Sequence, residues 1–357
     1  MQHLHPPSSK NAVKKATKAY QKSSASEKQM ELLDQWRASH SYVLKIFSQW
    51  LKRKIDKSDL DILFVQRLKR KNTVFDKLKR RDINDKPIID NLTRMHDLAG
   101  CRLIFESIED LYKFRNVVNS DQSLKNVNHK LKNLPDKYDY IKINKPSGYR
   151  GVHDIFECNP RKHRQSDPDS PWKGLLIEIQ YRTKVQHAWA TSVEISDIIN
   201  NKRNKFESER DECGQQFAVI NELLKRKYEN TGKGNLSETS KDDLKNAFNV
   251  LEKNTNLFNK LLNLEAITLI KGQDKIRVHN VLNIFRDDAG ELGLSHETFL
   301  NAKLAIDKTI FYENDSKSIN TVYIHAANPS LLRQTFQNYF LDNKLFSRYL
   351  ADSLKIE

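Results

Sequence analysis

The sequence has 357 residues, of which 38% are hydrophobic and 30% are charged, and its net charge is +15. A chain of this length predicts two folded units, and this composition allows a real core beneath a heavily charged surface. It contains no run of about 18 uncharged apolar residues, and its polar start lacks the apolar stretch of a signal peptide. We therefore expect a soluble, cytoplasmic protein with no membrane segment.

The positive charge is concentrated at the front of the chain. Residues 1–90 carry 21 Lys and Arg against 10 Asp and Glu, whereas residues 230–357 carry 16 against 16. Such a bias favours encounter with a polyanion such as a nucleotide or a nucleic acid. The alternative is a solvated, lysine-rich helical face. The three cysteines, Cys101, Cys158 and Cys213, are too far apart for a zinc pattern and are expected to be small core residues.

In chain order, residues 1–30 are predicted to be a flexible N-terminus, and apolar residues at helical spacing from Leu32 to Leu51 predict a long helix. A second helix is expected from Ser58 to Arg81. Short segments rich in β-formers then alternate with helical ones, which predicts an α+β domain with a mixed sheet flanked by helices. The expected strands are residues 101–106, 138–144, 152–157 and 174–182, and the expected helices are residues 107–119, 184–201 and about 206–228.

A Gly-, Ser- and Thr-rich break at residues 230–240 predicts a linker. We therefore divide the chain into a helical N-terminal segment plus α+β domain at 31–229 and a smaller, mainly helical C-terminal unit at 235–357. This second unit ends in a strand, a turn and an aromatic helix.

Two carboxylates are the candidate metal ligands. In "LLIEIQYRT" the period of two places Glu178, Gln180 and Arg182 on the face opposite to the apolar side chains. Asp97 comes directly before the turn into another strand. Mg²⁺ takes only one or two carboxylates and keeps the rest of its shell for water and phosphate, so Asp97 and Glu178 are suited to share one ion. The alternative is that the polar row on "LLIEIQYRT" is only the solvent-exposed face of an ordinary antiparallel sheet.

The stretch "INKPSGYRGVHDIFE" at 143–157 combines a turn glycine, an aromatic ring and three potential cations. Gly148 permits a tight bend, Tyr149 offers a face for a nucleobase, and Lys145, Arg150 and His153 can meet phosphate oxygens. These are the parts of an acceptor-nucleotide loop. Cations upstream, at Arg67, Lys69 and Lys77, can hold the polyphosphate of a donor. The alternatives are that Tyr149 is an ordinary turn aromatic, that His153 is a satisfied strand histidine, and that the upstream cations form a basic surface.

In this order the motifs resemble the synthetase domain of the RelA/SpoT alarmone enzymes. The resemblance rests on "RLK" at 67–69 with Lys77, "DLAGCR" at 97–102, "YIKINKPSGYRGVH" at 140–153 and "EIQYRTKVQHAWA" at 178–190, and covers about residues 60–200. The sequence has Gly151 where relatives commonly carry Ser, and Cys101 replaces a branched apolar residue; neither is a proposed catalytic group.

The resemblance implies a nucleotidyltransferase-like sheet and a pyrophosphokinase that moves the β,γ-pyrophosphate of ATP to a ribose 3'-hydroxyl and releases AMP. It assigns ATP binding to Arg67, Lys69 and Lys77, and Mg²⁺ binding to Asp97 and Glu178, with Glu178 also placed to receive the hydroxyl proton. Tyr149 would stack on the acceptor base. Lys145 and His153 would contact acceptor phosphate, and Gln180 would orient the ribose.

The identity of the acceptor is left open by these motifs. Family members make guanosine or adenosine alarmones, or pyrophosphorylate the 3'-CCA end of tRNA. The basic front and the extra C-terminal unit favour tRNA, with GDP or GTP as the alternative. The aromatic ending is similar to that of fused toxin–antitoxin members (CapRel-type), whose pseudo-zinc-finger domain restrains the enzyme until a phage protein releases it.

On this interpretation Phe346 and Tyr349, three apart on one helical face, cover the nucleotide pocket as regulatory residues. The alternative is that Phe336, Tyr339, Phe340, Phe346 and Tyr349 form the core of a small domain. Two other functions are disfavoured. The His-Asp pairs at 96–97 and 153–154 suit a metal-dependent phosphohydrolase but lie inside synthetase motifs. A catalytically inactive tRNA-binding module would not need both carboxylates and the donor cations.

Overall fold

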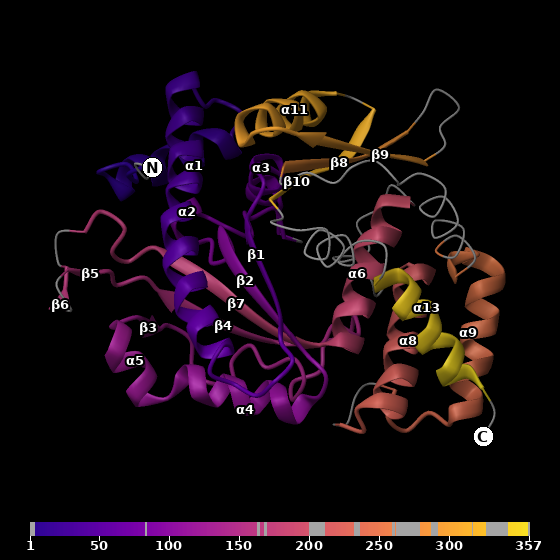
Figure 1. Ribbon diagram of the computed structural model, residues 1–357. Helices are drawn as coiled ribbons and strands as arrows, with labels where there is room; N and C mark the ends of the chain where they lie inside the picture. The colour runs from indigo at the N-terminus through magenta and orange to yellow at the C-terminus, as the bar shows by residue number, and fades with distance from the viewer. Residues whose placement is uncertain are drawn as a thin grey trace. The chain divides into compact units, whose positions relative to one another are not determined.

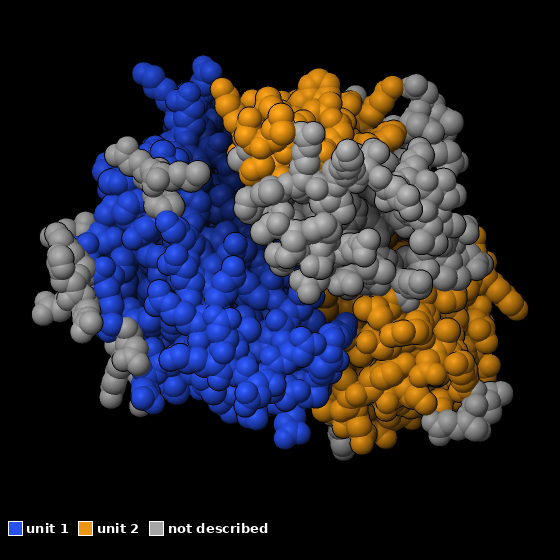
Figure 2. All heavy atoms as spheres, viewed as in Figure 1, with its two compact units in different colours: residues 1–143, 151–184 blue, residues 144–150, 185–357 orange. Residues whose placement is uncertain are grey.

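The structure is a computed structural model, which describes residues 4–82, 84–162, 165–167, 170–199, 211–231, 236–258, 261, 279–286, 292–315, 317–325 and 342–355. The chain forms two compact units (Figures 1 and 2). Unit 1 comprises Met1–Ile143 and Gly151–Lys184, and unit 2 comprises Asn144–Arg150 and Val185–Glu357. The division thus falls at Lys184 and sets a short loop apart from its neighbours in sequence, whereas the sequence predicted a division after residue 229.

Unit 1 is built on a five-stranded mixed sheet of order β1-β2-β7-β4-β3. The β2 and β7 strands are parallel, and the other neighbours are antiparallel. The strands are β1 (Leu63–Leu68), β2 (Ala99–Phe105), β3 (Lys130–Leu131), β4 (Val152–Glu157) and β7 (Leu176–Thr183), with a small separate pair β5 (Arg161–Lys162) and β6 (Gln165–Ser166). The helices are α1 (Lys10–Gln21), α2 (Glu27–Ile55), α3 (Lys71–Lys79), α4 (Ile108–Asn119) and α5 (Asp121–Val127), with a short 3₁₀ helix η1 (Leu92–Arg94). The predicted α+β fold is confirmed.

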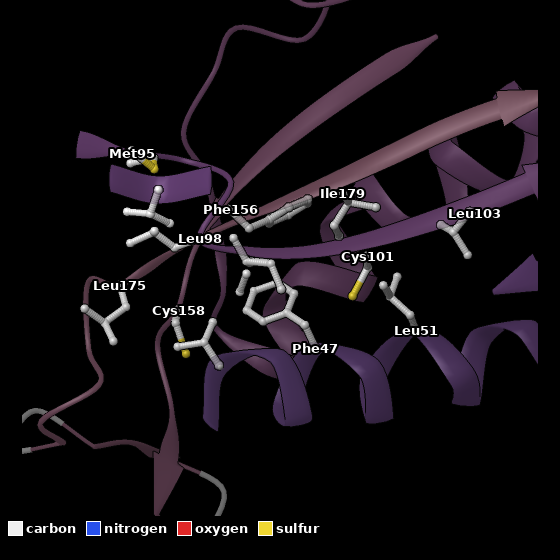
Figure 3. Packing of buried hydrophobic residues seen from close by; sticks show 14 of the residues in the cluster. Phe47, Leu51, Met95, Leu98, Cys101, Leu103, Phe156, Cys158, Leu175 and Ile179 are labelled. Carbon is white, nitrogen blue, oxygen red and sulfur yellow. The ribbon is translucent and has the colours of Figure 1, made fainter. Parts of the chain in front are cut away.

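One face of this sheet carries the core of unit 1. The α2 helix begins with a capping box at Ser26 and buries the apolar stripe predicted from its sequence. Figure 3 shows Phe47 and Leu51 of α2 packed toward Cys101, Phe156 and Ile179 of the sheet. All three cysteines of the chain are buried and free, as predicted. Because side chains alternate along a strand, the residues between these core positions point to the opposite face.

The N-terminal segment is more ordered than predicted. Residues 10–21 form α1, which buries Val13, Ala16 and Thr17. Gln21 Nε2 donates hydrogen bonds to the carbonyls of Leu78 and Ile89, 3.1 and 2.6 Å away. A helix with only one narrow buried stripe among lysines gives a weak pattern, which is why the sequence suggested flexibility.

Two segments adopt a different structure from the one predicted. The expected helix from Ser58 to Arg81 is instead β1 followed by α3, because Leu63–Leu68 pairs along its whole length with β2. The expected strand at 138–144 is a series of turns. Its Asp139 carboxylate accepts hydrogen bonds from the backbone N–H groups of Ile141 and Lys142, both at 3.1 Å. Such local capping competes with strand pairing.

Unit 2 contains a helical cluster and a second sheet. Its helices are α6 (Lys184–Ile199), α8 (Glu212–Tyr228), α9 (Lys241–Thr255), α11 (Ala302–Asn314) and α13 (Asp342–Leu354), and its strands are β8 (His279–Arg286), β9 (Leu292–Phe299) and β10 (Ser318–His325), in the antiparallel order β10-β8-β9. The predicted strand at the end and the helix after it are present, but β8 and β9 were not predicted. The described C-terminal residues are thus mainly helical, as predicted, and also contain a three-stranded sheet. Among the described residues no helix is long and apolar enough to cross a membrane.

Two buried histidines predict that the protein loses stability in mild acid. Burial lowers the pKa of both His40 and His129 from 6.5 to about 4. Between these values the unfolded chain binds protons that the folded chain does not. Stability therefore falls as the pH falls from about 6.5 toward 4, by roughly 1.4 kcal/mol per pH unit for each histidine.

The variant His40→Asn tests this expectation. His40 Nδ1 lies 2.7 Å from the Trp36 carbonyl, and an Asn amide can donate to the same oxygen without titrating. The free energy of unfolding, measured with denaturant from pH 7 to 5, should depend less steeply on pH in the variant. The difference in slope should correspond to up to about one bound proton. An unchanged slope would contradict the assignment of this acid sensitivity to His40.

Candidate active site

Polar side chains of three neighbouring strands share the face of the sheet opposite to α2. In the strand register, Gln180 of β7 is paired with Arg102 of β2 on one side and with His153 of β4 on the other. Glu178 lies two residues earlier on the same face of β7. The Arg102 Nε atom donates to Gln180 Oε1 at 3.3 Å. The predicted row of Glu178 and Gln180 is therefore a cross-strand polar cluster.

Glu178 is held ionised by its neighbours. His153 Nδ1 lies 2.9 Å from Glu178 Oε1, and Gln180 Nε2 donates to Glu178 Oε2 at 2.6 Å. Burial by itself raises the pKa of this carboxyl, but the charge and hydrogen bond of His153 and the amide of Gln180 outweigh it and lower the pKa to about 2. Both side chains of the His153–Glu178 pair remain 14% exposed, so the pair is reachable from solvent.

Asp97 is bound by two lysines. It lies two residues before β2, where Lys69 Nζ donates to Asp97 Oδ2 at 2.6 Å and Lys77 Nζ donates to the same oxygen at 2.9 Å. Burial opposes ionisation, yet the two ammonium groups hold the pKa of Asp97 well below its usual range. The backbone N–H of Lys69 donates to the Leu98 carbonyl at 2.8 Å, which ties the lysine to the start of β2.

The two carboxylates lie within electrostatic reach of each other. The charge of Asp97 raises the pKa of Glu178, and both carboxylates act on His96, whose pKa is lowered by burial. Arg67 belongs to the same group: burial lowers the pKa of Lys69, and the charges of Lys77 and Arg67 lower it further. The structure thus brings together the predicted donor cations and the predicted metal ligands within unit 1.

The donor set at this site fits a Mg²⁺ ion with few protein ligands. In the part of the chain that the structure describes, no three His, Cys, Asp or Glu side chains gather as a metal-binding group. Mg²⁺ needs only one or two carboxylates when phosphate and water complete its shell. Asp97 and Glu178 are two mutually repelling carboxylates. Asp97 Oδ1 and both Glu178 oxygens each keep a lone pair beyond the hydrogen bond that they accept, whereas Asp97 Oδ2 already accepts from both lysines. A divalent cation between them would relieve this repulsion.

The acceptor residues are divided between the two units. His153 and Gln180 belong to unit 1, whereas Lys145 and Tyr149 belong to unit 2. Gly148 has a φ of +79°, a left-handed conformation that favours glycine. Lys145 Nζ lies 5.3 Å from the centre of the Tyr149 ring, close enough for a cation–π contact. The predicted loop is thus a compact turn with its cation over its aromatic ring.

The predicted regulatory residues lie in the helical cluster of unit 2. Phe346 is wholly buried, and Tyr349 is half-buried with its ring 4.9 Å from that of Tyr228. Phe346 therefore occupies the interior position that the small-domain alternative describes, and a regulatory role for either residue stays a prediction. Phe336, Tyr339 and Phe340 lie outside the described residues.

Sequence reasoning did not assign His96 and Arg102 to the site. His96 was noticed only as half of a His-Asp pair, and Arg102 only as a strand residue. Their proximity to Glu178 and Gln180 depends on the parallel pairing of β2 with β7, which brings together residues almost 80 positions apart. The one available signal was that Arg102 and Gln180 both interrupt apolar strands with a polar side chain.

The candidate site lies within a segment that matches a known protein family. Residues 66–205 match the family described as "Region found in RelA / SpoT proteins". The chain is 31% identical over 127 residues to GTP pyrophosphokinase YwaC of Bacillus subtilis (strain 168), which covers 35% of this chain and 52% of that protein. GTP pyrophosphokinase YjbM of the same organism is 26% identical over 125 residues, covering 35% and 51%. The chain thus spans about half the length of these relatives.

Solved structures with similarity to this chain include two small alarmone synthetases of Bacillus subtilis. Small alarmone synthetase 2 has a TM-score of 0.38 at 21% identity and covers 52% of this chain and 90% of its own. Small alarmone synthetase 1 bound to its product pppGpp has a TM-score of 0.38 at 17% identity and covers 52% and 85%.

Proposed function

We propose that this chain, which carries a RelA/SpoT region at residues 66–205, is an ATP-dependent pyrophosphokinase. It transfers the β,γ-pyrophosphate of ATP to a ribose 3'-hydroxyl. The observation that carries the proposal is the pair of ionised carboxylates, Asp97 and Glu178, set beside the cations Arg67, Lys69 and Lys77 in unit 1. The relatives named GTP pyrophosphokinase support the same reaction class.

In this proposal the chain positions two reactants and balances charge. The acceptor oxygen forms a bond to the β-phosphorus of ATP, the bond from that phosphorus to the oxygen of the α-phosphate breaks, and AMP leaves with that oxygen. Arg67, Lys69 and Lys77 bind the triphosphate. Asp97 and Glu178 would hold Mg²⁺, which neutralises charge on the phosphates. Nothing covalent is required of the protein, because orientation and charge compensation supply the rate.

Besides its role as a Mg²⁺ ligand, Glu178 acts on the acceptor hydroxyl. With a pKa of about 2 it is ionised throughout the neutral range and accepts a hydrogen bond from the 3'-hydroxyl. A base this weak takes the proton only late in the transfer, so orienting the attacking oxygen is its larger contribution. Gln180, whose amide already donates to Glu178, orients the ribose beside it, and His153 contacts acceptor phosphate.

The favoured acceptor is the 3'-CCA end of tRNA, which would make the protein a translation-blocking toxin. The excess of 21 basic over 10 acidic residues in the first 90 supports a large polyanion. The part of the chain beyond residue 235 would be a regulatory domain that restrains this toxin until a phage protein binds to that domain. The protein would act in the cytoplasm. The alternative acceptor is GDP or GTP, giving (p)ppGpp, and the names of the relatives favour it.

Transfer of label from γ-labelled ATP tests the reaction and the acceptor together. The purified protein is incubated with Mg²⁺ and either bulk tRNA, GDP, GTP or unlabelled ATP, and AMP release is measured in parallel. We expect AMP and tRNA that carries label at its 3' end. Label on GDP or GTP alone would support the alternative. If the protein binds tRNA but releases no AMP and labels no acceptor, it is a binding module and not an enzyme.

A further inference from the structure

The loop Asn144–Arg150, which carries Tyr149, is packed into unit 2. A side chain at Gly148 would meet α8 and α6 closely: a Cβ built there lies 3.0 Å from Asn221 Cβ and 3.2 Å from Ala218 Cα of α8, and 3.3 Å from Trp189 Cζ2 of α6. The backbone of the loop therefore approaches α8 as nearly as a glycine allows. This close contact couples the position of the loop to that of the helix.

An ion pair fixes the far end of the loop to the end of the same helix. Arg150 is paired with Glu229, which directly follows α8, and their side chains are only 3% and 4% exposed. Arg150 Nη2 also donates to Thr231 Oγ1 at 2.6 Å, and Gln186 Nε2 donates to Glu229 Oε1 at 3.0 Å. A buried ion pair with further hydrogen bonds fixes the position of this end of the loop, because loss of either partner would leave the other charge buried and uncompensated.

A continuous series of aromatic rings joins Tyr149 to the C-terminal helix. The ring centres of Tyr149 and Trp189 are 6.5 Å apart, those of Trp189 and Phe217 are 5.9 Å apart, and those of Phe217 and Phe346 are 6.1 Å apart. Each separation lies within the range of favourable ring contacts. Trp189 Nε1 also donates to the Phe217 carbonyl at 2.9 Å. Trp189, Phe217 and Phe346 are all buried, so a change at one end displaces packed neighbours.

A second contact joins the C-terminal helix to the end of α8 that holds the ion pair. Tyr228 donates its hydroxyl hydrogen to Asp352 Oδ2 at 2.8 Å, and its ring is 4.9 Å from that of Tyr349. Tyr228 is the neighbour of Glu229 in sequence. Thus α13 contacts α8 at Phe217, in the first half of the helix, and at Tyr228, its last residue. The loop contacts α8 along the same stretch, at Ala218 and Asn221 and at the Glu229 that follows the helix.

From these contacts we propose that α13 sets the affinity for the acceptor by supporting, through α8, the loop that carries Tyr149. Trp189, Phe217 and Phe346 are positioning residues in this scheme. The assignment of the loop to acceptor binding rests on the proposed function, whereas the supporting role of α13 is an alternative to the restraint by the chain beyond residue 235. Because coupling between two sites is reciprocal, a ligand that binds α13 or displaces it would change acceptor affinity, and acceptor binding would in turn change the docking of α13.

The test compares two variants with a matched control. Phe346→Ala removes the last ring of the series, and Tyr228→Phe removes only the hydroxyl that donates to Asp352, so it preserves folding if the first variant does not. Val250→Ala on α9 is the control, because Val250 is 60% exposed in the same unit. For each, KM is measured separately for acceptor and ATP, using whichever acceptor takes label.

Phe346→Ala should raise the acceptor KM by about tenfold or more, with ATP KM and kcat within about twofold, and Tyr228→Phe should shift the acceptor KM in the same direction by less. Phe346→Leu, which refills most of the volume, should restore part of the affinity. An unchanged acceptor KM in folded Phe346→Ala, or an equal rise in both KM values, would overturn the proposal.

Hydrogen exchange separates failure of this proposal from failure of the proposed function. The amides of residues 144–150 should exchange about fivefold faster or more in Phe346→Ala and measurably faster in Tyr228→Phe, but not in Val250→Ala. This measurement needs no substrate. Unchanged exchange in folded variants would refute the coupling even if the enzyme is active, whereas faster exchange in a protein that transfers no label would refute only the function.

Whether the transfer rate rises or falls also distinguishes a supporting role of α13 from inhibition by covering a nucleotide pocket. If α13 blocks a nucleotide pocket, Phe346→Ala with Tyr349→Ala raises basal transfer and arrests bacterial growth. If α13 supports the acceptor loop, the same folded double variant transfers less at low acceptor concentration. An increase in transfer at every acceptor concentration would therefore reject the supporting role.

Discussion

Glu178→Gln is expected to lower the rate of pyrophosphate transfer by about 10² or more while leaving the fold intact. The substitution keeps the shape of the side chain but removes its charge. It also replaces one of the two carboxylate oxygens by an amide N–H₂, so that only one of the present partners, His153 Nδ1 and Gln180 Nε2, still faces an oxygen. The polar cluster must then rearrange, so the oxygen that orients the acceptor hydroxyl is lost together with one proposed ligand of the metal.

Asp97→Asn should reduce the rate by a similar factor but should also cost stability. Lys69, whose side chain is 9% exposed, would keep its buried ammonium group without the carboxylate that compensates it. Steady-state rates must therefore be compared alongside thermal melting. We expect a lower melting temperature for Asp97→Asn than for Glu178→Gln, and a rate loss in both that exceeds any loss of folded protein.

Glu157→Gln is the matched control for the two carboxylates. Glu157 lies at the end of β4 in the same sheet, and its carboxylate is 3.0 Å from Lys132 Nζ. This substitution removes one charge from the sheet away from the polar cluster, so the rate should stay within about twofold of the original. Near-normal turnover in Asp97→Asn or Glu178→Gln with normal melting would show that the wrong carboxylates were chosen.

The central strands and their polar face could be predicted because they obey simple rules. The β2, β4 and β7 strands are short, rich in β-branched and aromatic residues, and bounded by turns. Once β7 was recognised, its alternation placed Glu178 and Gln180 on one face. The register that sets His153 and Arg102 beside Gln180 could not be predicted, because it depends on pairing between strands far apart in sequence.

Other features were missed because local patterns were ambiguous. The segment Leu63–Leu68 has apolar and charged residues that fit a helix as well as a strand, and pairing with β2 decides the outcome. The placement of the loop Asn144–Arg150 in unit 2 depends on Arg150 meeting Glu229, 79 residues away. A loop of turn formers carries no local sign of such a partner. The ion pair between Lys69 and Asp97 was hidden for the same reason, although each residue was predicted as functional.

Tyr149→Ala is expected to weaken acceptor binding by roughly 5- to 150-fold, since a stacked base contributes about 1 to 3 kcal/mol. The affinity for ATP should stay close to that of the original protein, because the proposed donor cations lie on β1, on α3 and between them, not in this loop. Both affinities can be measured by direct binding of a nonhydrolysable ATP analogue and of the acceptor identified by label transfer.

Two further substitutions separate stacking on the base from packing within unit 2. Tyr149 also packs against Trp189, so an alanine removes both interactions. Tyr149→Phe keeps a flat ring and should bind acceptor nearly as well as the original, whereas Tyr149→Leu keeps apolar volume against Trp189 but offers no face for a base. If Leu binds acceptor as weakly as Ala, the ring acts by stacking. If Leu binds as well as Phe, the residue acts by holding the loop in place, and the base must be recognised elsewhere. Loss of ATP binding with retained acceptor binding in Tyr149→Ala would instead reverse the assignment of the two nucleotides to their sites.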